Sequence, residues 1–146
     1  MRLSFDLDDT LVTRIHSWTF EPGLPGFRED SEYLRLGTVE LFNWIRQNGH
    51  EIWIYTNSYR GFKNLTDWFT HCNIPVDQAI NQVLHDEARM KLDPRNRVQK
   101  FPPWFEIDMH FDDLDELASV DNIFQVLPTD DNWVETIKNY IVQNTQ

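Results

Sequence analysis

Residues 3–11 of the chain read LSFDLDDTL, and this stretch decides the fold class. The mainly apolar segment 3–7 is typical of a buried strand. Asp6 stands near its end, and Asp8 and Asp9 follow it. Further along the chain, short apolar runs alternate with longer helical patterns, which is typical of β-α-β units. The sequence therefore predicts a doubly wound α/β fold around a mainly parallel, five-stranded sheet.

The remaining elements are expected where apolar periodicity is strongest. Further strands are expected at 51–56, near 79–84, at 107–111 and at 122–127. Helices are expected at 38–48, about 61–72, near 114–119 and about 131–143. Residues 13–37 combine β-forming residues with two Pro and three Gly, which predicts a flap or hairpin over the end of the first strand.

Length and composition narrow the class of protein. The 146 residues are the size of one ordinary domain, so we expect a single domain over 1–146. The formal net charge of −11 repels phosphate backbones and disfavours nucleic acid as a partner. The single cysteine excludes an internal disulfide. No apolar run approaches the ~18 residues of a membrane span and no signal-peptide pattern is visible, so we expect a cytoplasmic protein without a membrane partner.

Acids and hydroxyls follow three of the predicted strands. They are Asp6 and Asp8 after the first strand, Thr56 and Asn57 after the second, and Asp112 and Asp113 after the fourth. Parallel strands bring their carboxyl ends to one edge of the sheet, where ligands bind. Carboxylates gathered there repel one another unless a cation joins them, and an all-oxygen ligand set favours Mg²⁺ over Zn²⁺. The pattern predicts a Mg²⁺ site with open positions for a substrate phosphate.

Such a site can carry out phosphoryl chemistry. A carboxylate can attack phosphorus and form an aspartyl-phosphate. A second acid, two residues further on, can protonate the leaving oxygen and later activate water. A hydroxyl such as that of Thr56, together with a lysine, can hold the phosphoryl oxygens.

Three stretches resemble motifs of the haloacid dehalogenase (HAD) superfamily. FDLDDTL at 5–11 resembles motif I, Asp-x-Asp-x-Thr-Leu after an apolar strand. YTN at 55–57 resembles motif II, and HFDD at 110–113 resembles the Asp-Asp form of motif IV. The motifs stand in the family's order, and the match spans most of the chain.

The resemblance implies a role for each matching residue. Asp6 would be the nucleophile and a Mg²⁺ ligand, and Asp8 the general acid/base with its backbone carbonyl on the metal. Thr56 would bind the phosphoryl group, and Asp112 would ligate Mg²⁺ directly or through water, with Asp113 beside it. An acid at position 8 implies phosphatases rather than dehalogenases, so hydrolysis of a phosphorylated substrate is expected.

Three further residues are candidate contacts for a substrate. Asn57 is a candidate phosphate contact, although turn chemistry explains it equally well. Arg14 and Arg28 on the flap are candidate contacts for an anionic substrate.

The family's motif III lysine has more than one candidate. Lys100 is favoured, because the following prolines place its segment next to the strand at 107–111. Lys91 precedes Leu-Asp-Pro and superficially resembles the Lys-Pro-x-Pro context of many members. Lys63 is a third candidate. The favoured assignment makes Lys100 both a catalytic and a substrate-binding residue.

The gaps between the motifs leave no room for a large cap, because the gap 57–100 is expected to be filled by one helix and one strand. A capless site is open, so a nucleic-acid end phosphatase or a protein phosphatase remains a possible subclass. Two other classes compete. A response-regulator receiver also combines a doubly wound sheet, acids and Mg²⁺, but requires an Asp after its third strand. A non-catalytic binding or scaffold protein of the same fold is the other.

Overall fold

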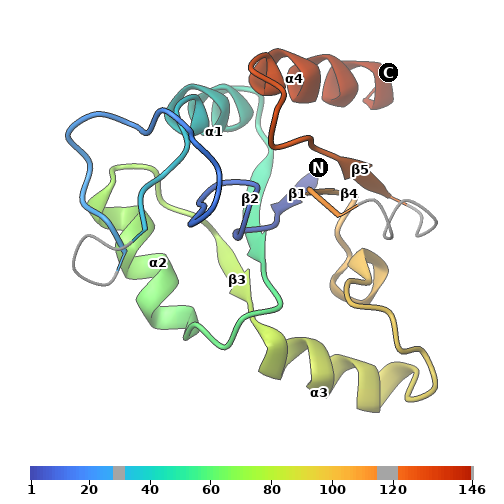
Figure 1. The fold of residues 1–146 in the computed structure, drawn as a ribbon. Helices are drawn as coiled ribbons and strands as arrows, with labels where there is room; N and C mark the ends of the chain where they lie inside the picture. Colours follow the sequence, from blue (N-terminus) through green and yellow to red (C-terminus); the bar gives the residue numbers. More distant parts are fainter. Residues whose placement is uncertain (28–31, 115–121, 146) are drawn as a thin grey trace.

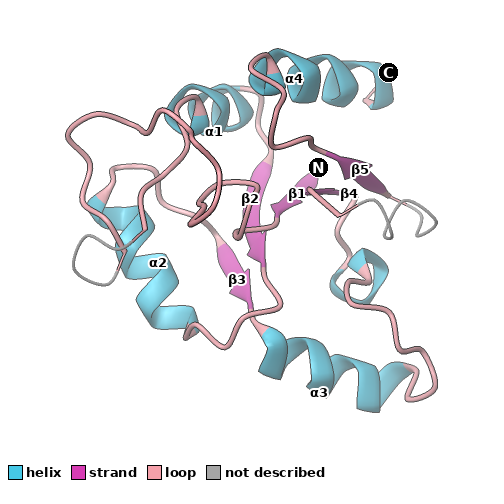
Figure 2. Cartoon of the chain, viewed as in Figure 1, coloured by secondary structure: helices cyan, strands magenta, loops and turns pink. Residues whose placement is uncertain are grey.

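The computed structural model describes residues 1–27, 32–114 and 122–145 of the chain. Five parallel strands form one sheet in the order β3-β2-β1-β4-β5 (Figures 1 and 2). The strands are β1 (Arg2–Phe5), β2 (Glu51–Tyr55), β3 (Gln78–Ile80), β4 (Met109–Asp112) and β5 (Ile123–Gln125). The predicted α/β class with a five-stranded sheet is confirmed, and the sheet is parallel throughout.

Helices cover both faces of this sheet. They are α1 (Thr38–Gln47), α2 (Phe62–His71), α3 (Gln82–Leu92), the 3₁₀ turn η1 (Pro102–Phe105) and α4 (Trp133–Asn144). Phe42 of α1 packs 5.0 Å from the Phe5 ring of β1 and 6.1 Å from Phe69 of α2. On the opposite face, the ring of His85 in α3 lies 5.8 Å from Tyr55 of β2. Figure 1 shows α1 beside α4, with α3 on the far side of the sheet. This arrangement agrees with a doubly wound, Rossmann-like fold.

Strand alternation separates two apolar cores. Phe5 and Phe111 belong to the larger cluster, under α1, α2 and α4. Tyr55 belongs to the smaller cluster, on the side of α3 and η1. Because side chains alternate with a period of two, Asp6 and Asp112 continue the face of the smaller cluster. Both acids therefore leave the sheet on the same side.

The flap expected at 13–37 is described for residues 13–27 and 32–37. Two antiparallel bridges, Phe20 with Arg35 and Phe27 with Glu32, hold it in a hairpin-like path. The N–H of Arg35 also donates to the Leu11 carbonyl at 2.7 Å. The flap is thereby fastened to the segment that follows β1.

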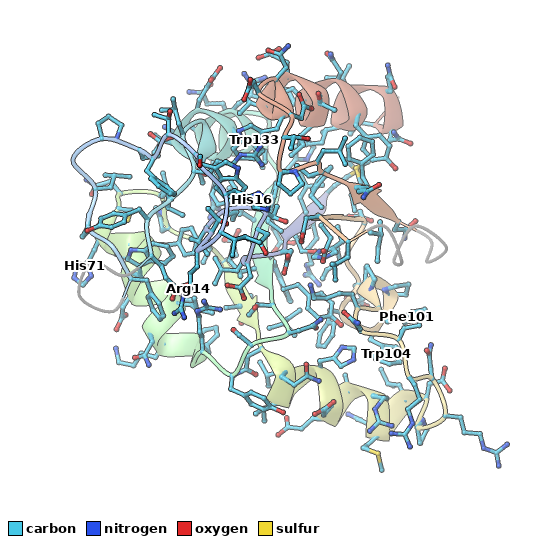
Figure 3. The ribbon with its side chains drawn as sticks, viewed as in Figure 1. Arg14, His16, His71, Phe101, Trp104 and Trp133 are labelled. Atoms are coloured by element: carbon cyan, nitrogen blue, oxygen red, sulfur yellow. The ribbon has the colours of Figure 1, made fainter. Side chains whose placement is uncertain are left out.

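Arg35 fixes the flap to the segment before α4. Its guanidinium lies 4.3 Å from the centre of the Trp18 ring and 4.6 Å from that of Trp133. It also donates to backbone carbonyls at 3.1–3.4 Å, those of Thr10, Leu127, Pro128 and Asp130. Figure 3 shows Trp133 at the start of α4. A buried arginine that binds this many carbonyls acts as a structural cross-link.

The prediction of a strand near 79–84 is wrong beyond Ile80. Asn81 caps a helix, since its Oδ1 accepts the Leu84 N–H at 3.0 Å, and α3 begins at Gln82. Val83 and Leu84 are therefore helical, and the gap 57–100 holds two helices and a strand rather than one of each. A short apolar run does not distinguish a strand from the first turn of a helix.

Smaller differences concern element ends. The first strand ends at Phe5 rather than at residue 7, and β4 begins at Met109 rather than at residue 107. The helix expected near 114–119 lies outside the described residues except for Leu114, and Arg28 also lies outside them. Within the described ranges, no large cap interrupts the fold.

None of the helices in the described part of the chain is both long enough and apolar enough to cross a membrane.

Candidate active site

Three aspartates meet at the carboxyl end of the sheet. Asp6 follows β1, Asp112 ends the neighbouring strand β4, and Asp113 comes next. The Asp6 N–H donates to the Phe111 carbonyl at 2.9 Å, which extends the pairing of the two strands. One carboxylate oxygen of each aspartate lies within 4.8 Å of the other two. We call Asp6, Asp112 and Asp113 the aspartate cluster.

Lys100 joins two members of the aspartate cluster. Its Nζ lies 2.7 Å from Asp112 Oδ2 and 3.1 Å from Asp6 Oδ1, and its side chain is only 1% exposed. Burial by itself lowers the pKa of Lys100, but the adjoining carboxylates raise it above its usual value. Lys100 is therefore a charged ammonium inside the site.

A chain of hydrogen bonds positions Lys100. The Phe101 N–H donates to Tyr55 Oη at 3.1 Å, and that hydroxyl lies 2.5 Å from His85 Nδ1. His85 Nε2 lies 3.1 Å from the Val98 carbonyl, which requires an Nε2–H donor and leaves Nδ1 to accept from Tyr55. The His85 ring also packs 5.3 Å from Trp104, and Figure 3 shows Phe101 and Trp104 on this side of the molecule. The segment before η1 is thus tied to β2 and α3.

A buried histidine orients Asp112. His110 Nε2 donates to Asp112 Oδ2 at 2.9 Å, and its Nδ1 lies 2.7 Å from Ser4 Oγ. Burial lowers the pKa of His110 to about 4, so the ring is neutral and Nδ1 accepts from the serine hydroxyl. Burial alone raises the pKa of Asp112, but the bond from His110 and the charge of Lys100 bring it below its usual value. Asp112 is therefore an ionised carboxylate with a fixed orientation.

Asp6 and Asp113 are less well compensated. Burial raises the pKa of Asp6 well above its usual range; Lys100 opposes this shift, and Asp112 and Asp113 add to it. Burial also raises the pKa of Asp113. Thr10 Oγ1 lies 3.3 Å from Asp6 Oδ2 and 3.4 Å from Asp113 Oδ1, so these two oxygens share one hydroxyl proton at long distance. A cation between them would compensate charges that the protein itself leaves in excess.

Thr56 and Asn57 lie at the end of β2, beside β1. Thr56 is buried, and its Oγ1 accepts the Ser58 N–H at 3.2 Å in a hydroxyl-stabilised turn. Asn57 Nδ2 donates to Gln99 Oε1 at 3.2 Å, which links this loop to the residue before Lys100. Asn57 Oδ1 is buried and has no hydrogen-bond partner among the described residues. Such an atom is costly unless a bound group pairs with it.

The structure does not bring the Asp8 carboxylate into the aspartate cluster. Its two oxygens each accept from Arg60, from Nη1 and from Nη2, both at 3.0 Å. Arg60 also forms an ion pair with Glu32, which is 2% exposed. The Asp8 side chain is 54% exposed, so its carboxylate sits on the solvent side of this pair. Asp8 is joined to the loop after β2 and to the flap rather than to β4.

The other two lysine candidates lie elsewhere. Lys91 is exposed near the end of α3, and Lys63 pairs with Asp67 on the surface of α2 at 2.8 Å. Of the three lysines, only Lys100 contacts the aspartate cluster within the described part of the chain. Lys100 is therefore the lysine candidate that lies at the aspartate cluster.

Sequence reasoning assigned no role to Arg60, Tyr55, His85 or His110. Arg60 stands three residues after Asn57, in a loop that the parallel sheet brings to the same edge, and this position is its only local signal. The contacts of Tyr55 and His85 join residues 30 positions apart, for which no local pattern exists.

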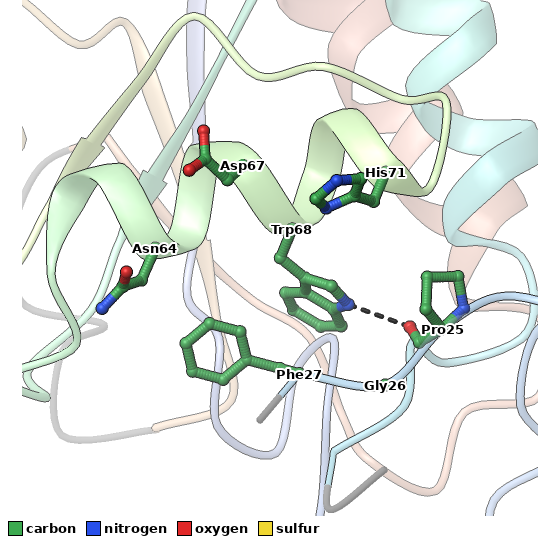
Figure 4. Close-up of a pocket in the computed structure, with 7 residues that line it drawn as sticks. All are labelled: Pro25, Gly26, Phe27, Asn64, Asp67, Trp68 and His71. Carbon is green, nitrogen blue, oxygen red and sulfur yellow. Dashed lines mark hydrogen bonds between the residues drawn. The ribbon is translucent and has the colours of Figure 1, made fainter. Parts of the chain in front are cut away.

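A cavity of about 420 Å³ lies away from the aspartate cluster, between the flap and α2 (Figure 4). Phe27, Trp68 and His71 line it, and Trp68 Nε1 donates to the Pro25 carbonyl at 2.9 Å. Among the described residues that line it, the only acid is Asp67, which pairs with Lys63. These described lining residues include neither an acid cluster nor a buried cation, so the candidate site is placed at the sheet edge.

No protein-family model matches the chain, and no similar curated protein is found.

Proposed function

We propose that the protein is a Mg²⁺-dependent phosphomonoester hydrolase of the HAD type that works through an aspartyl-phosphate. The observation that carries the proposal is the buried contact of Lys100 with Asp6 and Asp112, beside Asp113, at the ends of adjacent strands. The resemblance of the three motifs points to the same residues. A purely structural cluster has no need for three carboxylates around one ammonium, because buried charges are costly unless matched.

The aspartate cluster fits Mg²⁺. Its donors are carboxylate oxygens, the ligand type that Mg²⁺ prefers, and they include no thiol or neutral imidazole. Asp6 and Asp113 share a single weak donor, Thr10, and this excess negative charge suits a divalent cation. Bound there, Mg²⁺ would neutralise the cluster and hold an oxygen of the substrate phosphate.

Asp6 performs the bond-making step in this proposal. One of its oxygens attacks phosphorus, the bond from phosphorus to the ester oxygen breaks, and the leaving oxygen takes a proton from an acid. Water then gives a proton to the conjugate base of that acid and attacks the aspartyl-phosphate, the bond from phosphorus to the Asp6 oxygen breaks, and inorganic phosphate leaves. Lys100 balances the charge of Asp6 and of the transferred oxygens in both steps.

Asp8, Thr56 and Asn57 assist. The resemblance assigns the proton transfers to Asp8, which Arg60 holds in a defined orientation two residues after Asp6. Thr56 lies at the end of the strand next to β1, and the unpaired Oδ1 of Asn57 leaves an acceptor beside it for a bound group. These residues would orient the phosphoryl group for attack.

The strand order disfavours a response-regulator receiver. Receivers of the flavodoxin-like type have the order 2-1-3-4-5, whereas this sheet has the order 3-2-1-4-5. The residue after β3 is Asn81, which caps α3 and is not the phosphoacceptor Asp that a receiver requires.

The experiment is release of phosphate from 4-nitrophenyl phosphate with Mg²⁺ or with a chelator. We expect Mg²⁺-dependent release by the wild type and none above background by Asp6→Asn. Asp67→Asn serves as the matched control, because Asp67 is an exposed acid on α2. Equal turnover by the wild type and by Asp6→Asn would remove Asp6 as nucleophile. If the wild type shows no release, a thermal shift with beryllofluoride and Mg²⁺ tests whether the site binds a phosphoryl mimic.

A further inference from the structure

A second cavity, of about 210 Å³, is lined in part by Asn57 and Gln99, the chain neighbours of Thr56 and Lys100. It lies between the loop after β2, the first turns of α3 and the segment 97–99 that precedes Lys100. Its polar lining consists of Asn57, Gln82, Asp86, Arg89, Arg97 and Gln99. A water molecule in bulk liquid occupies about 30 Å³, so the cavity has room for a small functional group but not for a polymer.

Two of the lining residues connect the cavity to the proposed site. Asn57 follows Thr56 and Gln99 precedes Lys100, so each lies one residue, about 3.8 Å along the backbone, from a proposed phosphoryl contact. Asn57 Nδ2 also donates to Gln99 Oε1 at 3.2 Å, so the two lining residues that neighbour Thr56 and Lys100 are bound to each other.

The cavity is basic, although the chain carries a net charge of −11. Arg89 and Arg97 contribute two positive charges against the one negative charge of Asp86, which accepts from Gln82 Nε2 at 3.0 Å. His85 also lines the cavity, but burial lowers its pKa, and both ring nitrogens are engaged by Tyr55 and Val98. The presence of two arginines at one cavity of a strongly acidic protein therefore requires a physical explanation.

Arg89 and Arg97 differ in the hydrogen bonds that their side chains form within the protein. Arg89 donates to the Pro94 carbonyl at 2.7 Å and so fixes the turn after α3. Arg97 makes no hydrogen bond or ion pair within the described ranges of the chain. A guanidinium presents paired donors that match the oxygens of a carboxylate or a phosphate. Arg97 is therefore the residue with donors left for a ligand.

We propose that this cavity binds a second oxyanion on the leaving group, so that the preferred substrate is a small phosphomonoester with another carboxylate or phosphate. This inference rests on the proposed hydrolase function. Arg97 binds the second oxyanion through the paired donors of its guanidinium. The limited volume selects small molecules rather than phosphorylated polymers.

The test compares three aryl esters that share a leaving-group ring: phenyl phosphate, 4-carboxyphenyl phosphate and 1,4-phenylene bisphosphate. We expect the wild type to favour at least one of the doubly anionic esters by about tenfold in kcat/KM, mainly through a lower KM. Arg97→Gln should abolish this preference and leave turnover of phenyl phosphate unchanged. Arg95→Gln is the matched control, because Arg95 is an exposed arginine in the same segment that does not line the cavity.

The comparison of the two anionic esters distinguishes a carboxylate from a phosphate as the second group. Equal kcat/KM values for all three esters in the wild type, or a preference that survives in Arg97→Gln, would overturn the inference and leave the hydrolase proposal intact.

A binding measurement separates the inference from the proposed function. If no ester is hydrolysed, the hydrolase proposal is tested by the beryllofluoride thermal shift, and separate thermal shifts with Mg²⁺ compare 4-phosphonobenzoate with phenylphosphonate. Greater stabilisation by 4-phosphonobenzoate that is lost in Arg97→Gln supports a second oxyanion site. Equal stabilisation by the two phosphonates contradicts it.

Discussion

Lys100 Nζ lies 3.1 Å from Asp6 Oδ1, although 94 positions separate the two residues in the chain. The same ammonium lies 2.7 Å from Asp112 Oδ2, and Lys100 and Asp112 are both at most 1% exposed. Since a buried charge without a partner is costly, Lys100 and Asp112 depend on each other for stability, and all three residues take part in the proposed chemistry.

Replacement of Lys100 should reveal this dependence. Lys100→Met leaves two buried carboxylates without their counter-ion, and we expect a loss of about 3–5 kcal/mol in the free energy of unfolding. Lys91→Met, at an exposed position of α3, should change it by less than about 0.5 kcal/mol. Urea denaturation without metal measures both. Mg²⁺ should restore part of the stability of Lys100→Met, and equal stabilities of the two variants would contradict the buried ion pair.

Asp6→Asn should stabilise the metal-free protein at neutral pH. Folding raises the pKa of the Asp6 carboxyl above its usual 3.8, so the folded protein binds the carboxyl proton more tightly than the unfolded chain does. The protein therefore loses stability as the pH rises from 3.8 to the raised pKa. An asparagine at this position does not titrate, so the variant does not lose this stability. Thermal melts between pH 4 and 8 should show that the melting temperature of Asp6→Asn increases relative to that of the wild type as the pH rises. Millimolar Mg²⁺ should remove this difference in melting temperature. A variant that is less stable than the wild type at pH 7 would argue against the excess charge.

His110 should make the protein sensitive to mild acid. Its pKa falls from a usual 6.5 to about 4 on folding, so the unfolded chain takes up a proton first as pH decreases. Between pH 6.5 and 4 this removes up to about 1.4 kcal/mol of stability per pH unit. His110→Gln should lack this component, which is measured by urea denaturation at several pH values. His71→Gln, at an exposed position on α2, should keep the wild-type slope.

Arg35→Lys should loosen the flap. Lysine can neither stack between Trp18 and Trp133 nor reach the same set of carbonyls, and we expect a loss of about 2 kcal/mol in the free energy of unfolding. The control is Arg14→Lys, whose side chain is 70% exposed. Limited proteolysis should cut within 13–37 faster in Arg35→Lys than in the control. Equal cutting rates would show that Arg35 does not hold the flap.

The fold class was predictable because its signals are local. Residues 3–11 combine a strand with the acids that follow it, and Gly49 ends α1 with the positive φ of 79° that a helix terminus favours. The misread segment 79–84 shows the limit of such signals, since the cap at Asn81 decides between strand and helix through one side-chain bond. The meeting of Asp6 with Asp112 was also predictable, because parallel strands end at a common edge.

What the sequence by itself determined is therefore the α/β architecture and the set of acids at the edge of its sheet, since both follow from periodicity and chain order. Only the tertiary structure decided which lysine reaches that edge, that Arg60 holds Asp8 apart from the aspartate cluster, and that Arg35 fastens the flap. These contacts join residues far apart in the chain. Their geometry depends on the packing of α3, η1 and the flap, and no local pattern encodes it.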